Sequence, residues 1–402
     1  MHRPDLRLPG TLRPNAAPDA GGDPGNDSGR LQQPVPGDGG SALRPGVARV
    51  VGDLRPAGGE NGDARPLSGG GQRPSGTGGA DGGLIGTVGG PGGSGGPDFA
   101  RPVAPGGYAW WYVDAFSDDG AQAFTLIAFV GSVFSPYYHW AKRRDPENHV
   151  AINVALYNRR GGRWAMTERG REALVRDDST LAIGPSALRW DGTALRITLN
   201  EISFPKPARV RGEVVIHPEV RTTVPQVLDG AGRHVWWPFA PRSRVELRMD
   251  NPDIRWNGHG YFDFNCGSEP LQDAFSRWDW SRAPLADGGA ALLYEVTPRQ
   301  GADRLLSLRV DRDGALSAFS PPPKAPLGAT GWRVARGTRC DVGAPPTVLR
   351  TLEDTPFYAR SLLSTRLAGE ETRAVHESID LDRLRAGWVW PLLPFRMPRR
   401  GG

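Results

Sequence analysis

The chain has 402 residues, a formal net charge of +5 and two cysteines. All 13 Trp, 8 Tyr and 13 Phe lie after residue 98, whereas residues 1–100 contain 28 Gly and 13 Pro. Such a segment buries too little apolar surface to offset its conformational entropy, so residues 1–98 are predicted to be disordered and the fold to begin near Phe99. This composition excludes an N-terminal catalytic domain, and glycines without a period of three exclude collagen.

Charge and hydropathy narrow the class of protein further. Only three of the 49 basic residues are lysine, and no dense basic run alternates with aromatic residues, so nucleic acid is not an expected partner. The longest apolar run, Ala123 to Phe134, has 12 residues, whereas a membrane-spanning helix needs about 20. The residues before it do not show the pattern of a signal peptide, so none is expected. The protein is therefore expected to be soluble or peripheral to a membrane.

After Phe99 the sequence predicts strands almost throughout. Runs rich in β-branched and aromatic residues predict strands at 124–130 and 149–157. The Asp191-Gly192 pair predicts a hairpin that joins 186–190 to 193–199. Further strands are predicted at 209–216, 233–237, 245–249, 260–264, 291–297, 304–310, 315–319, 332–335, 348–352, 358–365 and 373–378. Helical turns are predicted only at 271–275 and 379–385.

Many short strands, with turn residues every eight to twelve positions, are typical of β-sandwiches and β-barrels. The roughly 300 residues after Phe99 are too many for one eight-stranded barrel. The sequence therefore predicts an all-β protein with two consecutive β-barrel domains, residues 99–255 and 256–402. The join is expected near 251–258, where Pro252 and Gly258 interrupt the strand pattern.

The densest group of polar and titratable residues lies within 258–270. Alternation along a strand places one set of side chains on the opposite face from Phe262 and Phe264; this set is His259, Tyr261, Asp263 and Asn265. A strand that faces solvent would show the same alternation, so the pattern alone leaves both interpretations open.

Four further segments are unusually aromatic: residues 107–114, 135–140, 233–238 and 277–282. His234 and Trp236 share one strand face, and so do Trp110, Tyr112 and Asp114. These residues could fill a hydrophobic core. Thirteen Trp in the aromatic part of the chain favour instead a long apolar cavity, because aromatic walls are typical of pockets for apolar ligands. Neither the cysteines nor the histidines show metal-ligand spacing, so no metal is predicted.

Five blocks together resemble the acyclic carotenoid 1,2-hydratases, also called hydroxyneurosporene synthases; they span residues 105–114, 129–138, 163–170, 258–263 and 278–282. The resemblance extends from about Phe99 to the C-terminus. It implies two lipocalin-like domains and cofactor-free addition of water to the terminal C1–C2 double bond of neurosporene or lycopene. It further implies peripheral contact with the cytoplasmic side of a photosynthetic, pigment-bearing membrane, with other enzymes of carotenoid synthesis as partners.

The resemblance also implies the site residues. It gives catalytic roles to the positions here occupied by Asp263, Tyr261, His234 and Trp236. The aromatic residues expected to bind the substrate are Trp110, Tyr112, Tyr137 and Trp237. The family's block usually has a second Asp where this chain has Ser268, which leaves Asp263 as the candidate acid.

Alkene hydration requires a proton on the less substituted carbon, and water then captures the tertiary cation at C1. Burial among aromatic residues raises a carboxyl pKa, so Asp263 is expected to stay neutral and donate this proton. Trp236 and Tyr261 would stabilise the cation by about 2 kcal/mol or more each when desolvated, and His234 would accept the proton of the water. Two other interpretations remain: a carotenoid or lipid carrier with the same pocket, and a structural β-protein with tryptophans in its core.

Overall fold

A computed structural model describes residues 95–158 and 162–400. The segment predicted to be disordered, residues 1–98, lies outside the described residues except for its last four positions. The carbonyl oxygen of Pro97 accepts a hydrogen bond from Trp111 Nε1 at 3.1 Å. The chain therefore contacts the core two residues before Phe99.

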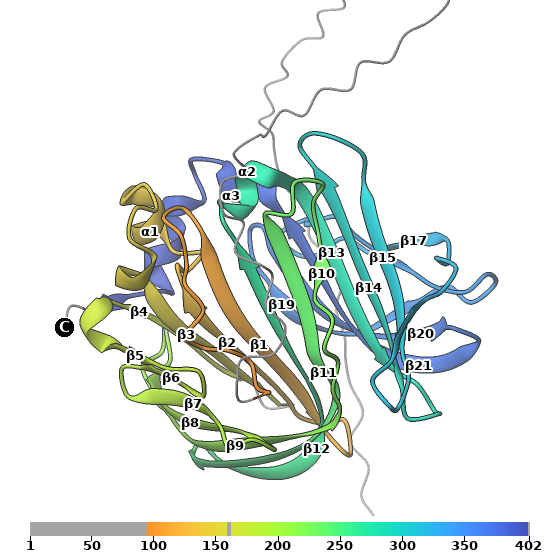
Figure 1. The fold of residues 1–402 in the computed structure, drawn as a ribbon, viewed down its shortest axis with the longest axis horizontal. Helices are drawn as coiled ribbons and strands as arrows, with labels where there is room; N and C mark the ends of the chain where they lie inside the picture. The colour runs from red at the N-terminus through yellow and green to blue at the C-terminus, as the bar shows by residue number, and fades with distance from the viewer. Residues whose placement is uncertain (1–94, 159–161, 401–402) are drawn as a thin grey trace, which may run out of the picture. The chain divides into compact units, whose positions relative to one another are not determined.

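Strands dominate the described residues, which confirms the all-β fold class (Figure 1). The first sheet contains β1 (Tyr108–Ser117), β2 (Ala123–Val130), β3 (Val150–Tyr157), β4 (Arg163–Arg169), β5 (Leu174–Arg176), β6 (Thr180–Ile183), β7 (Ser186–Trp190), β8 (Leu195–Ile202), β9 (Arg209–Val220), β10 (Gln226–Val227), β11 (His234–Asn251), β12 (Asp253–Gly267) and β22 (Arg399–Arg400). Its order is β22-β4-β3-β2-β1-β12-β11-β9-β8-β7-β6-β5, with β10 paired to β11. The β7–β8 hairpin around Asp191-Gly192 has the predicted pairing.

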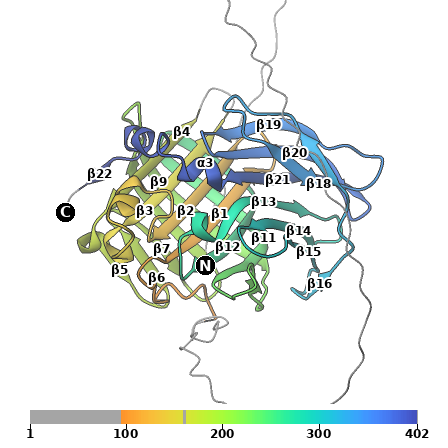
Figure 2. The same cartoon turned by 90° about the horizontal axis from the view of Figure 1, so that it is seen from above.

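The second sheet contains β13 (Phe275–Pro284), β14 (Ala290–Pro298), β15 (Arg304–Val310), β16 (Leu316–Ala318), β19 (Thr347–Asp354), β20 (Tyr358–Leu367) and β21 (Glu370–Asp380). Its order is β16-β15-β14-β13-β21-β20-β19, and β17 (Lys324–Leu327) pairs separately with β18 (Arg336–Arg339). Figures 1 and 2 show β2–β7 on one side and β13–β21 on the other. The chain passes from one sheet to the other between Gly267 and Phe275; the division into domains at residue 255 stays a prediction.

The helices are short: α1 (Pro136–Trp140), α2 (Leu271–Ala274), α3 (Leu381–Arg385) and the 3₁₀ turns η1 (Pro146–Asn148), η2 (Arg171–Ala173) and η3 (Trp390–Phe395). The predicted helical turns correspond to α2 and α3. α1 was not predicted, although Ser135 caps it by accepting a hydrogen bond from the Tyr138 N–H at 2.9 Å. The strand predicted at 332–335 is wrong, because Arg333 has a φ of 57° and the segment forms a turn.

The core divides according to the two faces of β1 and β12. On one face, Trp111 and Phe262 pack with apolar side chains of β2–β9 and β11. On the other face, Trp110 and Tyr261 pack with aromatic side chains of the second sheet. The polar face predicted for residues 259–265 is therefore largely turned toward the second sheet, and only His259 at its end is exposed.

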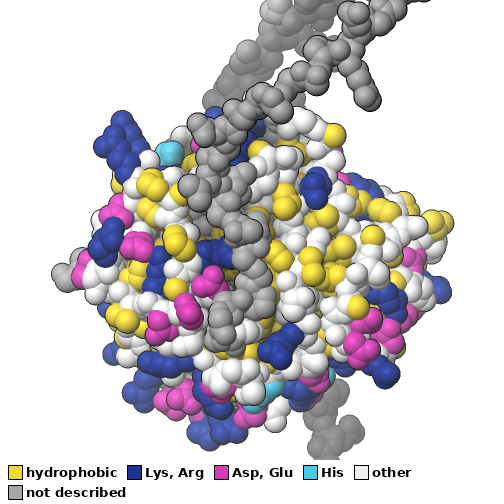
Figure 3. Space-filling view, in the orientation of Figure 1, with side chains coloured by type: hydrophobic (Ala, Val, Ile, Leu, Met, Phe, Trp, Pro, Cys, Tyr) yellow, Lys and Arg dark blue, Asp and Glu magenta, His cyan; other side chains and the backbone are white. Residues whose placement is uncertain are grey.

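Charged side chains gather on the outer faces. Figure 3 shows acidic and basic groups interspersed along the lower edge of the face drawn, where Figure 1 places β8, β9 and β12. Exposed ion pairs on β9 and β11 include Arg248 with Glu246 at 2.9 Å and Arg211 with Asp250 at 3.3 Å. Each such pair contributes only about 0–1 kcal/mol, so the fold is stabilised chiefly by its apolar layers.

Candidate active site

A cavity of about 350 Å³ lies between the two sheets. Its wall is largely aromatic and comes from both sheets and their connections: Trp110, Tyr112, Phe129, Phe134, Trp164, Trp278, Trp280, Tyr294 and Phe357. Asp263 and Asn265 of β12 also line it. The cavity thus combines an apolar wall with a small number of polar groups, as ligand pockets generally do.

Asp263 is the polar group at the centre of this arrangement. Its Oδ2 atom accepts hydrogen bonds from Trp236 Nε1 at 2.9 Å and from the Tyr261 hydroxyl at 2.8 Å. Asn265 Nδ2 donates to Oδ1 at 3.1 Å. The strand pattern explains this cluster, because residues 261, 263 and 265 share one face of β12 and Trp236 lies beside Asn265 on β11.

The environment of Asp263 favours its neutral form. Burial raises the pKa of this carboxyl well above its usual range, and the hydrogen bonds from Trp236 and Tyr261 lower it only in part. The carboxylates of Glu377 and Asp114 raise it further. Oδ2 already accepts two hydrogen bonds, whereas Oδ1 accepts one, from Asn265, so we place the proton of the neutral acid on Oδ1.

His234 lies on β11 beside Tyr108 and Glu269. Its side chain is fully buried, with the Tyr108 hydroxyl 2.9 Å from Nδ1 and Glu269 Oε1 3.3 Å from Nε2. Burial lowers the pKa of the imidazole. A neutral ring that accepts from Tyr108 and donates to Glu269 has both nitrogens engaged, and His234 is not part of the cavity wall.

Only two of the four residues expected to bind substrate line the cavity. Trp110 and Tyr112 line the cavity. Trp237 lies on the opposite face of β11, where its Nε1 donates to the Thr222 carbonyl at 3.1 Å. Tyr137 lies in α1 and its hydroxyl donates to the Met397 carbonyl at 3.2 Å. Neither Trp237 nor Tyr137 is part of the cavity wall.

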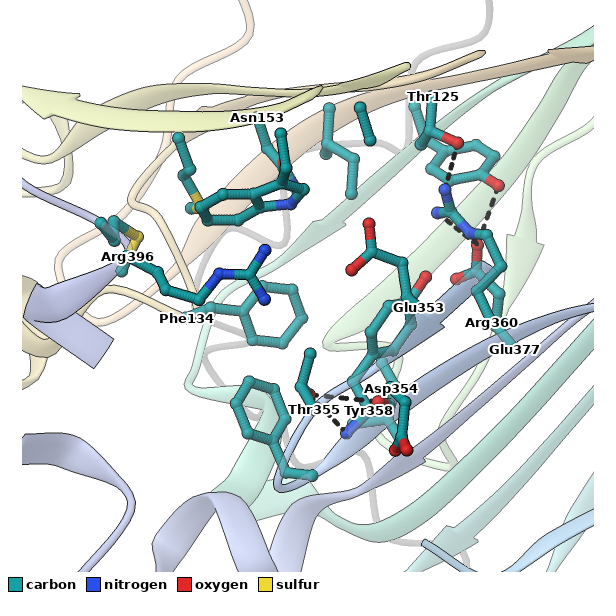
Figure 4. A pocket seen from close by; sticks show the side chains of 18 of the residues that line it. Thr125, Phe134, Asn153, Glu353, Asp354, Thr355, Tyr358, Arg360, Glu377 and Arg396 are labelled. Carbon is teal, nitrogen blue, oxygen red and sulfur yellow. Dashed lines mark hydrogen bonds and ion pairs between the residues drawn. The ribbon is translucent and has the colours of Figure 1, made fainter. Parts of the chain in front are cut away.

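Two buried ion pairs beside the cavity were not predicted. Arg282 Nε donates to Asp114 Oδ2 at 3.0 Å, and Arg360 Nη2 lies 2.6 Å from Glu377 Oε1. The Tyr112 hydroxyl lies between the pairs, 3.0 Å from Asp114 Oδ2 and 2.8 Å from Glu377 Oε1. Figure 4 shows Arg360 between Thr125 and Glu377 at the cavity wall.

The sequence pattern pointed to one residue of these ion pairs, Asp114, but not to the other three. Asp114 shares a strand face with Trp110 and Tyr112, so alternation identified it as a neighbour of the site. Arg282, Arg360 and Glu377 come from β13, β20 and β21 of the second sheet. No local pattern links residues so far apart in the sequence, and only the packing of the two sheets brings them together.

Glu353 is another acidic residue that lines the cavity. The Tyr157 hydroxyl donates to its Oε1 at 2.6 Å, and burial raises the pKa of this carboxyl. Arg396 lines the same cavity and places its guanidinium 4.4 Å from the ring centroid of Trp164 (Figure 4). In the described part of the chain, no three His, Cys, Asp or Glu side chains are placed to hold a metal ion.

The exposed part of the cavity lining, which forms its mouth, is mostly apolar. Trp332, Leu392 and Phe395 line the cavity and are exposed by 45%, 41% and 75%, respectively. Across residues 95–158 and 162–400, we find no helix with the length and apolar character needed to cross a membrane.

The fold and site thus define an all-β protein with a buried carboxyl group of raised pKa in the wall of an aromatic cavity. The family model of the carotenoid hydratase CrtC matches residues 126–402, and this chain belongs to that family. It is 52% identical to the acyclic carotenoid 1,2-hydratase of Thiocapsa roseopersicina, over 100% of both chains. The proteins of the same name from Rubrivivax gelatinosus and Cereibacter sphaeroides are 48% and 44% identical, over 94% and 69% of this chain and 94% and 99% of theirs.

Proposed function

We propose that this protein adds water across the terminal C1–C2 double bond of an acyclic carotenoid, such as neurosporene or lycopene, to give the 1-hydroxy product. Membership of the CrtC family and the names of the three relatives support the substrate class. The observation that carries the chemistry is Asp263, a buried acid with a raised pKa in an apolar cavity. A carrier would gain nothing from keeping a carboxylic acid there, because burying such a group is costly.

The reaction begins with transfer of the proton on Asp263 Oδ1 to C2. The π electrons form the new C–H bond and leave a tertiary cation at C1. The hydrogen bonds from Trp236 and Tyr261 to Oδ2 stabilise the carboxylate that forms, since hydrogen bonds to a charged group are stronger. The aromatic rings of the wall, Trp278 and Trp280 among them, stabilise the cation electrostatically.

Water then attacks C1 and loses a proton, which restores the charge balance. Every atom added comes from water and no electron leaves the substrate. The addition is therefore redox-neutral and needs no oxidant or reductant, and we propose that it proceeds without a cofactor. His234 remains a candidate for the group that receives this proton.

We also propose that the cavity mouth rests on the membrane that holds the carotenoid. Trp332, Leu392 and Phe395 would insert into the interface, and Arg396 beside them would attract anionic headgroups. Phe395→Ser should weaken co-sedimentation with anionic lipid vesicles. Val175→Ser, which changes a residue of 67% exposure in β5, outside the cavity wall, should not. Equal effects of both changes would contradict this placement.

The test of the activity uses purified protein with lycopene in anaerobic, cofactor-free buffer. The expected result is a product whose mass is greater by one water, with its hydroxyl at C1. Carotenoid that binds but is recovered unchanged would support the carrier instead.

A further inference from the structure

Glu377 presents a carboxylate at the same cavity as Asp263. It lies on β21, lines the cavity, and its side chain is 11% exposed. All of its hydrogen bonds within the described residues are made by Oε1, which accepts from Tyr112 at 2.8 Å and from Arg360 Nε at 2.9 Å. Oε2 is therefore free to accept a hydrogen bond from a molecule in the cavity.

The charge of Arg360 balances that carboxylate. The guanidinium is 2% exposed, lies 2.6 Å from Glu377 Oε1 and also donates to Thr125 Oγ1. The environment of Glu377 thus differs from that of Asp263, whose hydrogen-bond donors are all neutral groups.

Two other polar atoms of the cavity wall are available to ordered water. Asn153 Oδ1 and the Tyr358 hydroxyl are buried and have no hydrogen-bond partner among the described residues. Both residues line the cavity with Glu377. Buried polar atoms of this kind are normally satisfied by ordered water, which needs two to four polar partners.

His234 is a poorer candidate for the base that removes a proton from water, because Tyr108 and Glu269 already contact its two ring nitrogens. We infer that Glu377 is the general base that removes a proton from the water attacking C1, with Arg360 and Tyr112 as positioning residues. This inference rests on the proposed hydration.

The proton balance is complete. Asp263 gives one proton to C2, the water oxygen bonds to C1, and Glu377 Oε2 receives one proton from that water. Return of this proton from Glu377 to Asp263 through water in the cavity restores both groups. Asp263, whose hydrogen-bond donors are neutral, thus acts as the acid, and Glu377, which is paired with Arg360, acts as the base.

Glu377→Gln separates the two steps when the reaction runs in D₂O with lycopene. Hydration should fall at least 10²-fold, as is typical when a general base is lost. Protonation at C2 should continue, and the uncaptured cation returns to an alkene when the Asp263 carboxylate takes back a proton from C2 or from a methyl group on C1. Deuterium should therefore enter the unhydrated carotenoid, whereas Asp263→Asn should abolish both hydration and this exchange.

Glu201→Gln is the matched control, because Glu201 is buried, pairs with Arg169 at 2.7 Å and is not part of the cavity wall. It should hydrate lycopene within a few-fold of the wild type. If Glu377→Gln alone fails to fold, Glu377→Gln combined with Arg360→Met removes both buried charges and supports the same assay. Hydration by the Glu377 variant near the wild-type rate, or loss of hydration and exchange together in a folded variant, would overturn the inference. Failure of the wild type to hydrate lycopene would instead contradict the proposed function.

Discussion

Asp263 and Asp114 show how neighbouring strands give two buried carboxyl groups opposite environments. Asp114 lies opposite Tyr261 in the β1–β12 register and binds the guanidinium of Arg282. Asp263 lies two residues further along β12 and receives hydrogen bonds only from neutral groups. Burial without an adjacent cation favours the neutral acid at Asp263. The proton donor is therefore expected at Asp263.

Asp263→Asn should alter the pH dependence of stability. The native pKa of Asp263 is raised, so its contribution is fully present below the unfolded pKa of about 4 and is lost as pH rises toward the native value. Asn cannot ionise in either state. Above about pH 4, the free energy of unfolding of the variant should therefore rise relative to that of the wild type by up to about 1.4 kcal/mol per pH unit. Urea unfolding across pH measures this change, and a difference independent of pH would contradict the raised pKa.

Trp236→Phe should change the pH profile of catalysis. The Trp236 hydrogen bond lowers the pKa of Asp263, so its loss should raise that pKa further. Wild-type activity should fall as pH rises through the native pKa, because the neutral acid is the active form. In the variant this fall should move to higher pH, as rate measurements with lycopene would show. An unmoved profile would mean that the indole N–H does not tune the acid.

At the scale of the element, one face of β12 packs in the hydrophobic core of the first sheet and the other face borders the cavity. Phe262 is fully buried and packs with the first sheet, whereas Asp263 faces the cavity. Phe262→Ala should lower the free energy of unfolding by about 3–5 kcal/mol, as for other large-to-small core changes. Chemical denaturation measures this loss. A loss below about 1 kcal/mol would show that this face is not a packed core.

Local sequence patterns predicted much of β12 but less of the neighbouring strand β11. Alternation along residues 258–265 placed Tyr261, Asp263 and Asn265 on one face, as the structure has them. The strands predicted at 233–237 and 245–249 form the single strand β11, whose pairing with β12 shifts between Trp237 and Ser243. Pro238 and Pro241 interrupt the sequence pattern there, because proline cannot donate to the sheet, and the register shifts accommodate them.

At the scale of the molecule, the site depends on packing between two sheets that are distant in sequence. Composition and strand spacing predicted an all-β chain with its aromatic residues in the folded part. They could not predict that Arg360 and Glu377 of the second sheet would meet Tyr112 of the first. Such contacts depend on tertiary geometry that no periodicity encodes. The separation of His234 from the cavity arises in the same way.

Removal of residues 1–94 should leave thermal stability and hydration unchanged. Their composition predicts that they contribute no packed core, and the cavity is built from residues 110–397. The cut falls before Pro97, so its hydrogen bond from Trp111 is kept. Calorimetry and the lycopene assay on the shortened chain measure both properties. A lower transition temperature or lost activity would assign these residues a role in the folded protein.

The most direct test of the central claim, that Asp263 protonates C2, is hydration of lycopene in D₂O by the wild type and by Asp263→Asn. The wild type should place one deuterium at C2 of each hydrated end, and the reaction should be slower than in H₂O. The folded Asn variant should still bind the carotenoid, while hydration falls by at least the 10²–10⁴-fold typical of lost general acid catalysis. Hydration by that variant at near the wild-type rate, or a product without deuterium at C2, would contradict the account.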